Sequence, residues 1–358
     1  MSAGHLTQGQ CIGSLIGGAL GDTLGMPVET WTPAQIRKYV GTISAPIAPF
    51  IVLDRQGKVL DSDADGRLRY WGRDFSLGEY TDDTILTLAI ARSIADLGRV
   101  DAQDATMRQV EEYRLRKQDD GSVRGGFGGT TKSAFERILS GTSALESGIL
   151  EGPGNAPPMK MGPIGLYMAR TEAYHEGIEA ARTIGMATHL DPRSVAAGIA
   201  QAHAVYFAAH TDNHRLIDSV LDVVSKYEAH ADRRHTAWEK GSLLDRLTWV
   251  RENAHKSDEE AYHFLGNGGF VLESYPFTIF MAQRYWDSPI EGMLATVNMG
   301  GDCDTTGAMY GTIMGARHGN IWPASWQAVL EGRSEIADLG ARIARIGGDC
   351  DEQSPGRA

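Results

Sequence analysis

The chain has 358 residues, 42% of them hydrophobic and 22% charged, which is typical of a globular protein with one large domain or two ordinary ones. A formal net charge of -12 argues against a main role in wrapping nucleic acid or coating an anionic membrane surface. Three scattered cysteines, a first segment without a signal-peptide pattern, and no charge-free apolar stretch long enough to span a bilayer favour a soluble cytoplasmic protein.

Two predicted helices, residues 8–25 and 305–317, carry glycine at every fourth position. A glycine costs a helix roughly 1 kcal/mol relative to alanine, so seven in register need a packing reason. The spacing resembles that of dimerising membrane helices, but polar residues interrupt both segments. We expect two buried helices that cross with their backbones in close contact. The glycines are Gly13, Gly17, Gly21 and Gly25 in the first helix and Gly307, Gly311 and Gly315 in the second.

Residues 42–75 differ from the rest of a mostly helical chain. The segments Ile51-Val52-Leu53 and Lys58-Val59-Leu60 flank a polar turn and predict a short hairpin inside an insertion. The run Asp61-Ser62-Asp63-Ala64-Asp65-Gly66 matches the opening of a calcium-binding loop. The twelfth position of such a loop needs a bidentate glutamate, and here it is Gly72. We therefore interpret the run as a solvated acidic turn.

Residues 81–97 predict an amphipathic helix that begins with acids. Thr81 can cap this helix, and Asp82 and Asp83 lie at the positive end of its dipole. Acidic helix starts are common without any function, so this segment by itself is compatible with both a structural and a functional role.

A glycine-rich run, Gly125-Gly126-Phe127-Gly128-Gly129-Thr130-Thr131-Lys132-Ser133, precedes another predicted helix. It matches neither the Walker nor the GxGxxG pattern. A glycine-rich turn that opens a helix still exposes backbone N–H groups, which suits a phosphate or pyrophosphate; the alternative is a flexible turn with a helix cap. His189 also precedes a predicted helix start, at residue 192, and a lone histidine is more often structural.

The segment Gly300-Gly301-Asp302-Cys303-Asp304-Thr305-Thr306 places two acids and two threonines at a further predicted helix start. Residues 347–351 repeat its first five residues, but that copy runs into a polar tail with no helix to position it. We therefore expect the functional copy at 300–306, within one domain that covers residues 1–346, followed by a polar tail at 347–358.

Clustered carboxylates repel one another, so a fold that gathers them usually provides a cation. The two acidic helix starts offer only oxygen donors, which select hard divalent ions such as magnesium, manganese or calcium.

Seven short motifs follow one another along residues 8–320. They are Gly17 to Glu29, Tyr80 to Thr84, Gly125 to Lys132, Asn155 with Met161 to Gly165, Thr188 to Pro192, Glu273 to Pro276, and Val297 to Thr305. In this order they resemble the ADP-ribosylglycohydrolase family, which includes the dinitrogenase reductase-activating glycohydrolases, the human ADP-ribosyl-acceptor hydrolases and the jellyfish lens crystallins.

The resemblance implies an all-α orthogonal multi-helix bundle with two divalent cations, Mg²⁺ or Mn²⁺, in a cleft. It implies an enzyme that binds ADP-ribose or an ADP-ribosylated protein or small molecule and cleaves the glycosidic bond at the distal ribose, releasing ADP-ribose. The implied metal ligands are Thr81, Asp82, Asp83, Asp302, Asp304 and Thr305. The implied catalytic residues are Glu29, as general base or proton shuttle, and Asp304. The implied substrate-binding residues are Gly125, Gly126, Phe127, Gly128, Gly129, Asn155 and His189.

The chain departs from the family at residues 154–161, where relatives commonly have a Gly-Asn-Gly-Ala-Met-Arg-like run. Here Pro157 and Pro158 stiffen the segment and remove two amide donors. The acceptor from which ADP-ribose is released therefore stays open: arginine, serine, an acetyl ester, a phosphate or a nucleic acid end. Two other functions also stay open, a non-catalytic crystallin-like relative and a metal-dependent phosphatase that uses Asp302 as nucleophile.

Overall fold

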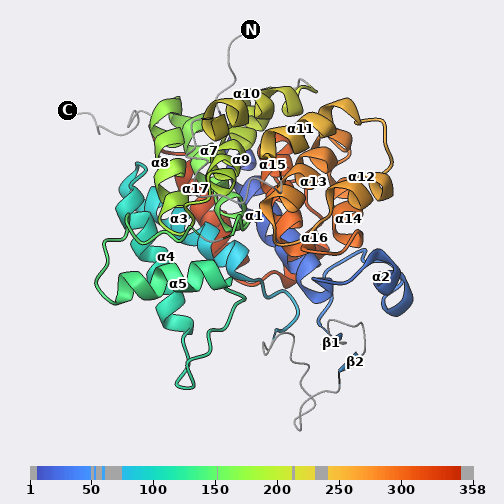
Figure 1. Ribbon diagram of the computed structural model, residues 1–358, viewed down its shortest axis with the longest axis horizontal. Coiled ribbons are helices and arrows are strands. Elements are labelled where there is room, and N and C mark those ends of the chain that lie inside the picture. Colours follow the sequence, from blue (N-terminus) through green and yellow to red (C-terminus); the bar gives the residue numbers. More distant parts are fainter. Residues whose placement is uncertain are drawn as a thin grey trace, which may run out of the picture.

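The computed structural model describes residues 6–49, 52–53, 59–60, 75–150, 152–211, 214–229 and 241–347, which form a bundle of crossing helices (Figure 1). These ranges contain seventeen α-helices, one 3-10 helix and one two-stranded hairpin, so the all-α prediction is confirmed. The first half contains α1 (Gln8–Gly25), η1 (Met26–Val28), α2 (Pro33–Tyr39), α3 (Asp82–Leu97), α4 (Ala102–Arg116), α5 (Gly129–Leu139), α6 (Ala156–Met159), α7 (Gly162–Thr171) and α8 (Tyr174–Met186). The second half contains α9 (Pro192–His210), α10 (Leu216–Ala229), α11 (Leu243–Glu252), α12 (Asp258–Leu265), α13 (Val271–Arg284), α14 (Pro289–Asn298), α15 (Cys303–His318), α16 (Ala324–Val329) and α17 (Arg333–Ile343).

The glycine-lined helices α1 and α15 lie against each other, backbone to backbone, as the sequence predicts. A Cβ added to Gly21 would lie 2.0 Å from the carbonyl oxygen of Gly307, and one added to Gly311 would lie 2.0 Å from that of Gly17. No larger side chain fits at such distances without moving the backbone. The two helices run antiparallel, so the end of α1 meets the start of α15.

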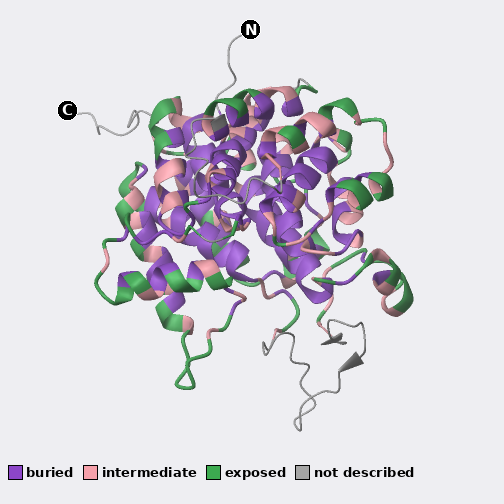
Figure 2. Cartoon of the chain, in the orientation of Figure 1, coloured by how far each residue is buried: buried purple, intermediate pink, exposed green. Residues whose placement is uncertain are grey.

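Most residues of these two helices are buried, and the helices pass through the middle of the molecule (Figure 2). The segment Gln8–Val28 is long and apolar enough to cross a membrane, but 94% of its apolar window is buried inside the protein. It also contains the buried acid Asp22. The burial identifies α1 as a core helix of the bundle.

The predicted hairpin is present: β1 (Val52–Leu53) pairs antiparallel with β2 (Val59–Leu60). The acidic run 61–66 and residues 348–358 of the tail lie outside the described residues, so their interpretation stays a prediction. Most of the buried hydrophobic residues between Leu6 and Ile343 form one contiguous cluster. The division into a domain at 1–346 and a tail likewise remains a prediction.

Candidate active site

The first acidic motif starts α3 and is held there by a side chain from α1. The Thr81 hydroxyl caps the helix, accepting a hydrogen bond from the backbone N–H of Asp83 and donating one of 3.0 Å to its Oδ2. The buried carboxylate of Asp22 accepts hydrogen bonds from the N–H of Thr81 (3.0 Å) and from the N–H and hydroxyl of Thr84 (3.1 and 2.6 Å). These contacts fix the turn that carries Asp82 and Asp83.

The second acidic motif follows a turn that only two glycines can form. Gly300 and Gly301 have φ values of 66° and 69°, and a Cβ on either would lie 2.0 Å from a carbonyl oxygen, of Trp31 or Asn267 respectively. The N–H of Gly301 donates to Trp31 O (2.7 Å), and the N–H of Asp302 donates to Asn267 O (2.6 Å). The turn therefore aims the start of α15 at the segment after α1.

This turn brings Glu29 to the second acidic motif. Thr30, the residue after Glu29, adopts a φ of 68° and donates its N–H to Gly301 O at 2.6 Å. As a result, carboxylate oxygens of Glu29, Asp302 and Asp304 lie within 4.8 Å of one another. Three carboxylates at this separation can hold a metal ion.

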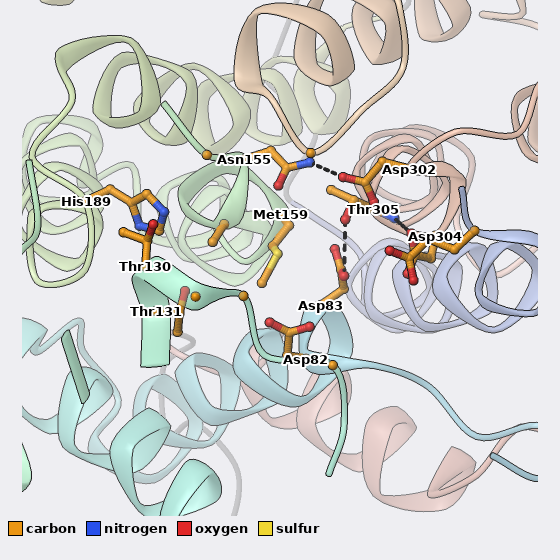
Figure 3. Close-up of a pocket in the computed structure, with 17 residues that line it drawn as sticks. Asp82, Asp83, Thr130, Thr131, Asn155, Met159, His189, Asp302, Asp304 and Thr305 are labelled. Atoms are coloured by element: carbon orange, nitrogen blue, oxygen red, sulfur yellow. Dashed lines mark hydrogen bonds between the residues drawn. The ribbon is translucent and has the colours of Figure 1, made fainter. Parts of the chain in front are cut away.

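The two acidic motifs meet where α3 and α15 begin. The hydroxyl of Thr305 donates a hydrogen bond of 3.2 Å to Oδ2 of Asp83 (Figure 3). Burial raises the pKa of both Asp83 and Asp304 well above the usual range, and the negative charge of the neighbouring carboxylates raises it further. The arrangement is therefore unfavourable for the ionised acids unless positive charge is supplied.

The donor atoms fit hard divalent cations. They are carboxylate and hydroxyl oxygens, and the buried Oδ1 of Asp83 accepts no hydrogen bond from any described residue. The six ligands predicted from the sequence all lie at these two helix starts. The Thr81 hydroxyl already donates a hydrogen bond to the carboxylate of Asp83.

A cavity of about 270 Å³ opens in front of the acids. Its acidic side consists of Glu29, Asp82, Asp83, Asp302 and Asp304. The glycine loop forms another part of its lining through Gly126, Gly128 and Gly129, followed by Thr130 and Thr131 (Figure 3). Gly128 caps α5 without any side-chain hydrogen bond, so no capping side chain satisfies the N–H groups of the first turn of α5. Two residues of the predicted loop lie outside the cavity lining, namely Gly125 and Phe127, whose buried ring packs edge-on against Tyr113.

Asn155 and His189, the two further residues predicted to bind substrate, both line the cavity: Asn155 lies beside Asp302, and His189 lies near Thr130 (Figure 3). The Asn155 amide donates to Oδ2 of Asp302 (2.6 Å) and to the hydroxyl of Ser274 (3.1 Å). Nδ1 of His189 lies 3.0 Å from the hydroxyl of Thr188. Burial, assisted by the charge of Lys160, lowers the pKa of His189 to about 3, so the imidazole is neutral at physiological pH.

Sequence analysis missed two residues that position the site, Asp22 and Asn267. Asp22 lies inside the first motif, where a single acid in a glycine-rich apolar helix is the signal that could have identified it. Asn267 lies in no motif; its amide donates to Gly300 O (2.6 Å) and supports the glycine turn. Sequence analysis also missed Lys160, whose side chain is completely buried.

The chain is similar to known proteins. The family model for ADP-ribosylglycohydrolase matches residues 5–352. The chain is 26% identical to the Escherichia coli protein YegU, with 86% of this chain and 87% of that protein covered. It is 26% identical to the ADP-ribosylhydrolase ARH3 of Xenopus tropicalis (75% and 81% covered) and 24% identical to the ADP-ribosylarginine hydrolase Tri1 of Serratia proteamaculans (74% and 67% covered).

A solved structure described as an ADP-ribosylglycohydrolase-related protein complex has the same fold. It superposes with a TM-score of 0.61 at 24% identity, covering 95% of this chain and 98% of that one.

Proposed function

Because this chain belongs to the ADP-ribosylglycohydrolase family, we propose that it hydrolyses the glycosidic bond at the distal ribose of ADP-ribosylated substrates with two divalent cations, Mg²⁺ or Mn²⁺. One observation carries the proposal: five carboxylates and a glycine loop at a helix start line one cavity. The loop suits a diphosphate, and the carboxylates suit the cations and the chemistry at a ribose.

The glycine loop binds the diphosphate of ADP-ribose. The N–H groups at the start of α5 and the positive end of its dipole attract an anion, and Gly128 and Gly129 present no side chain that would keep a phosphate away. His189 is neutral and contacts the bound nucleotide by hydrogen bonding or packing rather than by charge.

The acidic side acts on the distal ribose. Divalent cations would be held here by four carboxylates and two hydroxyls, those of Asp82, Asp83, Asp302, Asp304, Thr81 and Thr305. When bound, they would polarise ribose hydroxyls and lower the pKa of water. Asn155 fixes the orientation of Asp302 through its 2.6 Å hydrogen bond.

Glu29 moves the proton. Cleavage at the anomeric carbon builds positive charge on the ribose, a water attacks that carbon, and the acceptor leaves. The Glu29 carboxylate lies beside Asp302 and Asp304, accepts a proton from the attacking water and passes it to the departing acceptor.

The alternatives fit less well. A phosphatase nucleophile would end a buried strand, whereas Asp302 follows α14 and a glycine turn and directly precedes α15. A crystallin-like relative needs no metal acids, whereas five carboxylates line the cavity here.

A panel of ADP-ribosylated substrates tests the proposal. It contains arginine, serine, acetyl-ester, phosphate and nucleic-acid-end linkages, and free ADP-ribose is measured by chromatography. We expect catalytic release from at least one linkage. Release from none of them would contradict hydrolysis, and the responding linkage identifies the acceptor.

A further inference from the structure

Lys160 is a lysine buried without a hydrogen-bond partner among the described residues. Its side chain is 0% exposed, and no described residue accepts a hydrogen bond from its Nζ. Moving an ammonium group out of water is unfavourable unless an opposite charge compensates it. A lysine in such a position therefore calls for a nearby source of negative charge.

The backbone places Lys160 next to the acidic turn of α3. The preceding residue, Met159, lines the cavity (Figure 3). The hydroxyl of Thr87 donates both to Met159 O (3.4 Å) and to Asp83 O (2.6 Å), so the chain at Lys160 is tied to the turn that carries the acids.

Electrostatics connect the same groups. Burial lowers the pKa of Lys160 to about 7, and Asp82 is the carboxylate that acts against this shift. The charge of Lys160 in turn acts on His189, on another part of the cavity lining. Lys160 itself does not line the cavity, so it acts on the site through charge rather than by touching substrate.

We propose that Lys160 is a positioning residue, a fixed counter-charge behind the cavity wall that offsets the carboxylates around Asp82 and thereby weakens their hold on divalent cations. Five carboxylates without cations repel one another, and one fixed positive charge reduces that repulsion. The same charge repels an incoming cation, so it prevents the ions from binding too tightly.

This inference rests on the divalent-cation site of the proposed function, and calorimetry tests it without any activity assay. Mn²⁺ and Mg²⁺ are titrated into chelator-treated full-length protein at pH 6.5, below the pKa of about 7 that burial gives Lys160, so that most of the protein carries the charge before the ions bind. We expect Lys160→Met to bind the ions roughly tenfold more tightly, because it removes a like charge while preserving apolar packing. Lys160→Arg should bind like the wild type. Lys226→Met is the matched control, since it removes an exposed lysine on α10.

The outcomes distinguish failure of the proposed metal site from failure of the role proposed for Lys160. If the wild type binds no divalent cation, the proposed function loses its metal site. If the wild type binds but a Lys160→Met protein that is folded without ions binds equally or more weakly, this inference alone is overturned. If Lys160→Met folds only with saturating Mn²⁺, as followed by thermal unfolding, the inference is supported, because bound ions then replace the missing charge. If it is unfolded both with and without Mn²⁺, Lys160 is a structural residue and the inference fails.

Discussion

The carboxylate of Asp22 accepts a hydrogen bond of 2.6 Å from the hydroxyl of Thr84, which joins the central helix α1 to the first turn of α3. Backbone N–H groups of Thr81 and Thr84 donate to the same carboxylate. The turn that presents Asp82 and Asp83 is thus fixed by a buried side chain that itself does not line the cavity.

We expect Asp22→Ala to lower the free energy of unfolding by about 3 kcal/mol or more, because three buried donors lose their acceptor. Divalent-cation affinity should fall with it, since the acidic turn loosens. Urea unfolding and calorimetric Mn²⁺ titration measure the two effects. Asp22→Asn keeps one acceptor oxygen and should lose less stability. An Asp22→Ala protein as stable as the wild type would show that the turn does not depend on this contact.

Glu29→Gln should reduce turnover by roughly two orders of magnitude or more, the usual scale for removing a positioned acid or base. Most ADP-ribose and metal binding should remain, because glutamine has nearly the same shape. Steady-state kinetics and calorimetric ADP-ribose titration test this pair of effects. Near-normal turnover would remove Glu29 from the chemistry, and complete loss of ADP-ribose binding would make it a ligand instead.

Asp302→Asn and Asp304→Asn should lose metal and activity together, because each removes a charged ligand. The repeated string at 347–351 provides a control within the same chain: Asp349→Asn with Asp351→Asn should change neither. Metal content by atomic emission and turnover are compared across the four substitutions. A large loss of turnover in the tail variant would show that the copy at 347–351 takes part in the reaction.

Gly21→Ala should destabilise the protein by about 3 kcal/mol or more, because its Cβ would lie 2.0 Å from the carbonyl oxygen of Gly307. Gly9→Ala, in the same helix but exposed, meets nothing closer than 3.9 Å and should leave the stability unchanged or raise it slightly, because the position lies in the first turn of α1. Thermal and urea unfolding give both values. Equal effects of the two substitutions would contradict the backbone contact between α1 and α15.

The spacing of the glycines predicted the contact between α1 and α15, because glycine at every fourth position marks a helix face that another backbone can approach. Seven glycines at a spacing of four predict two helices in backbone contact. In the structure the glycines from Gly13 to Gly25 pack against the backbone between Asp304 and Gly319. The two acidic motifs were recognisable for a similar reason, since acids at a helix start are a local pattern.

Contacts between distant segments were not predictable in the same way. The loop residue Phe127 belongs to a motif but packs into the core against Tyr113, and only the tertiary structure determines which way its ring points. Asn267 supports the turn at Gly300 through a hydrogen bond across 33 positions of the chain, and no local pattern marks it. The same holds for Lys160, whose importance comes from its surroundings.

The most direct test of the account is release of ADP-ribose before and after removal of divalent cations. Wild-type protein is assayed on a responding ADP-ribosylated substrate in Mg²⁺, after treatment with EDTA, and after Mn²⁺ or Mg²⁺ is restored. We predict that release stops on chelation and returns with the ions, while thermal unfolding shows that the chelated protein is still folded. Release that continues at an unchanged rate in excess EDTA would contradict the claim that the carboxylates at the starts of α3 and α15 act through bound cations.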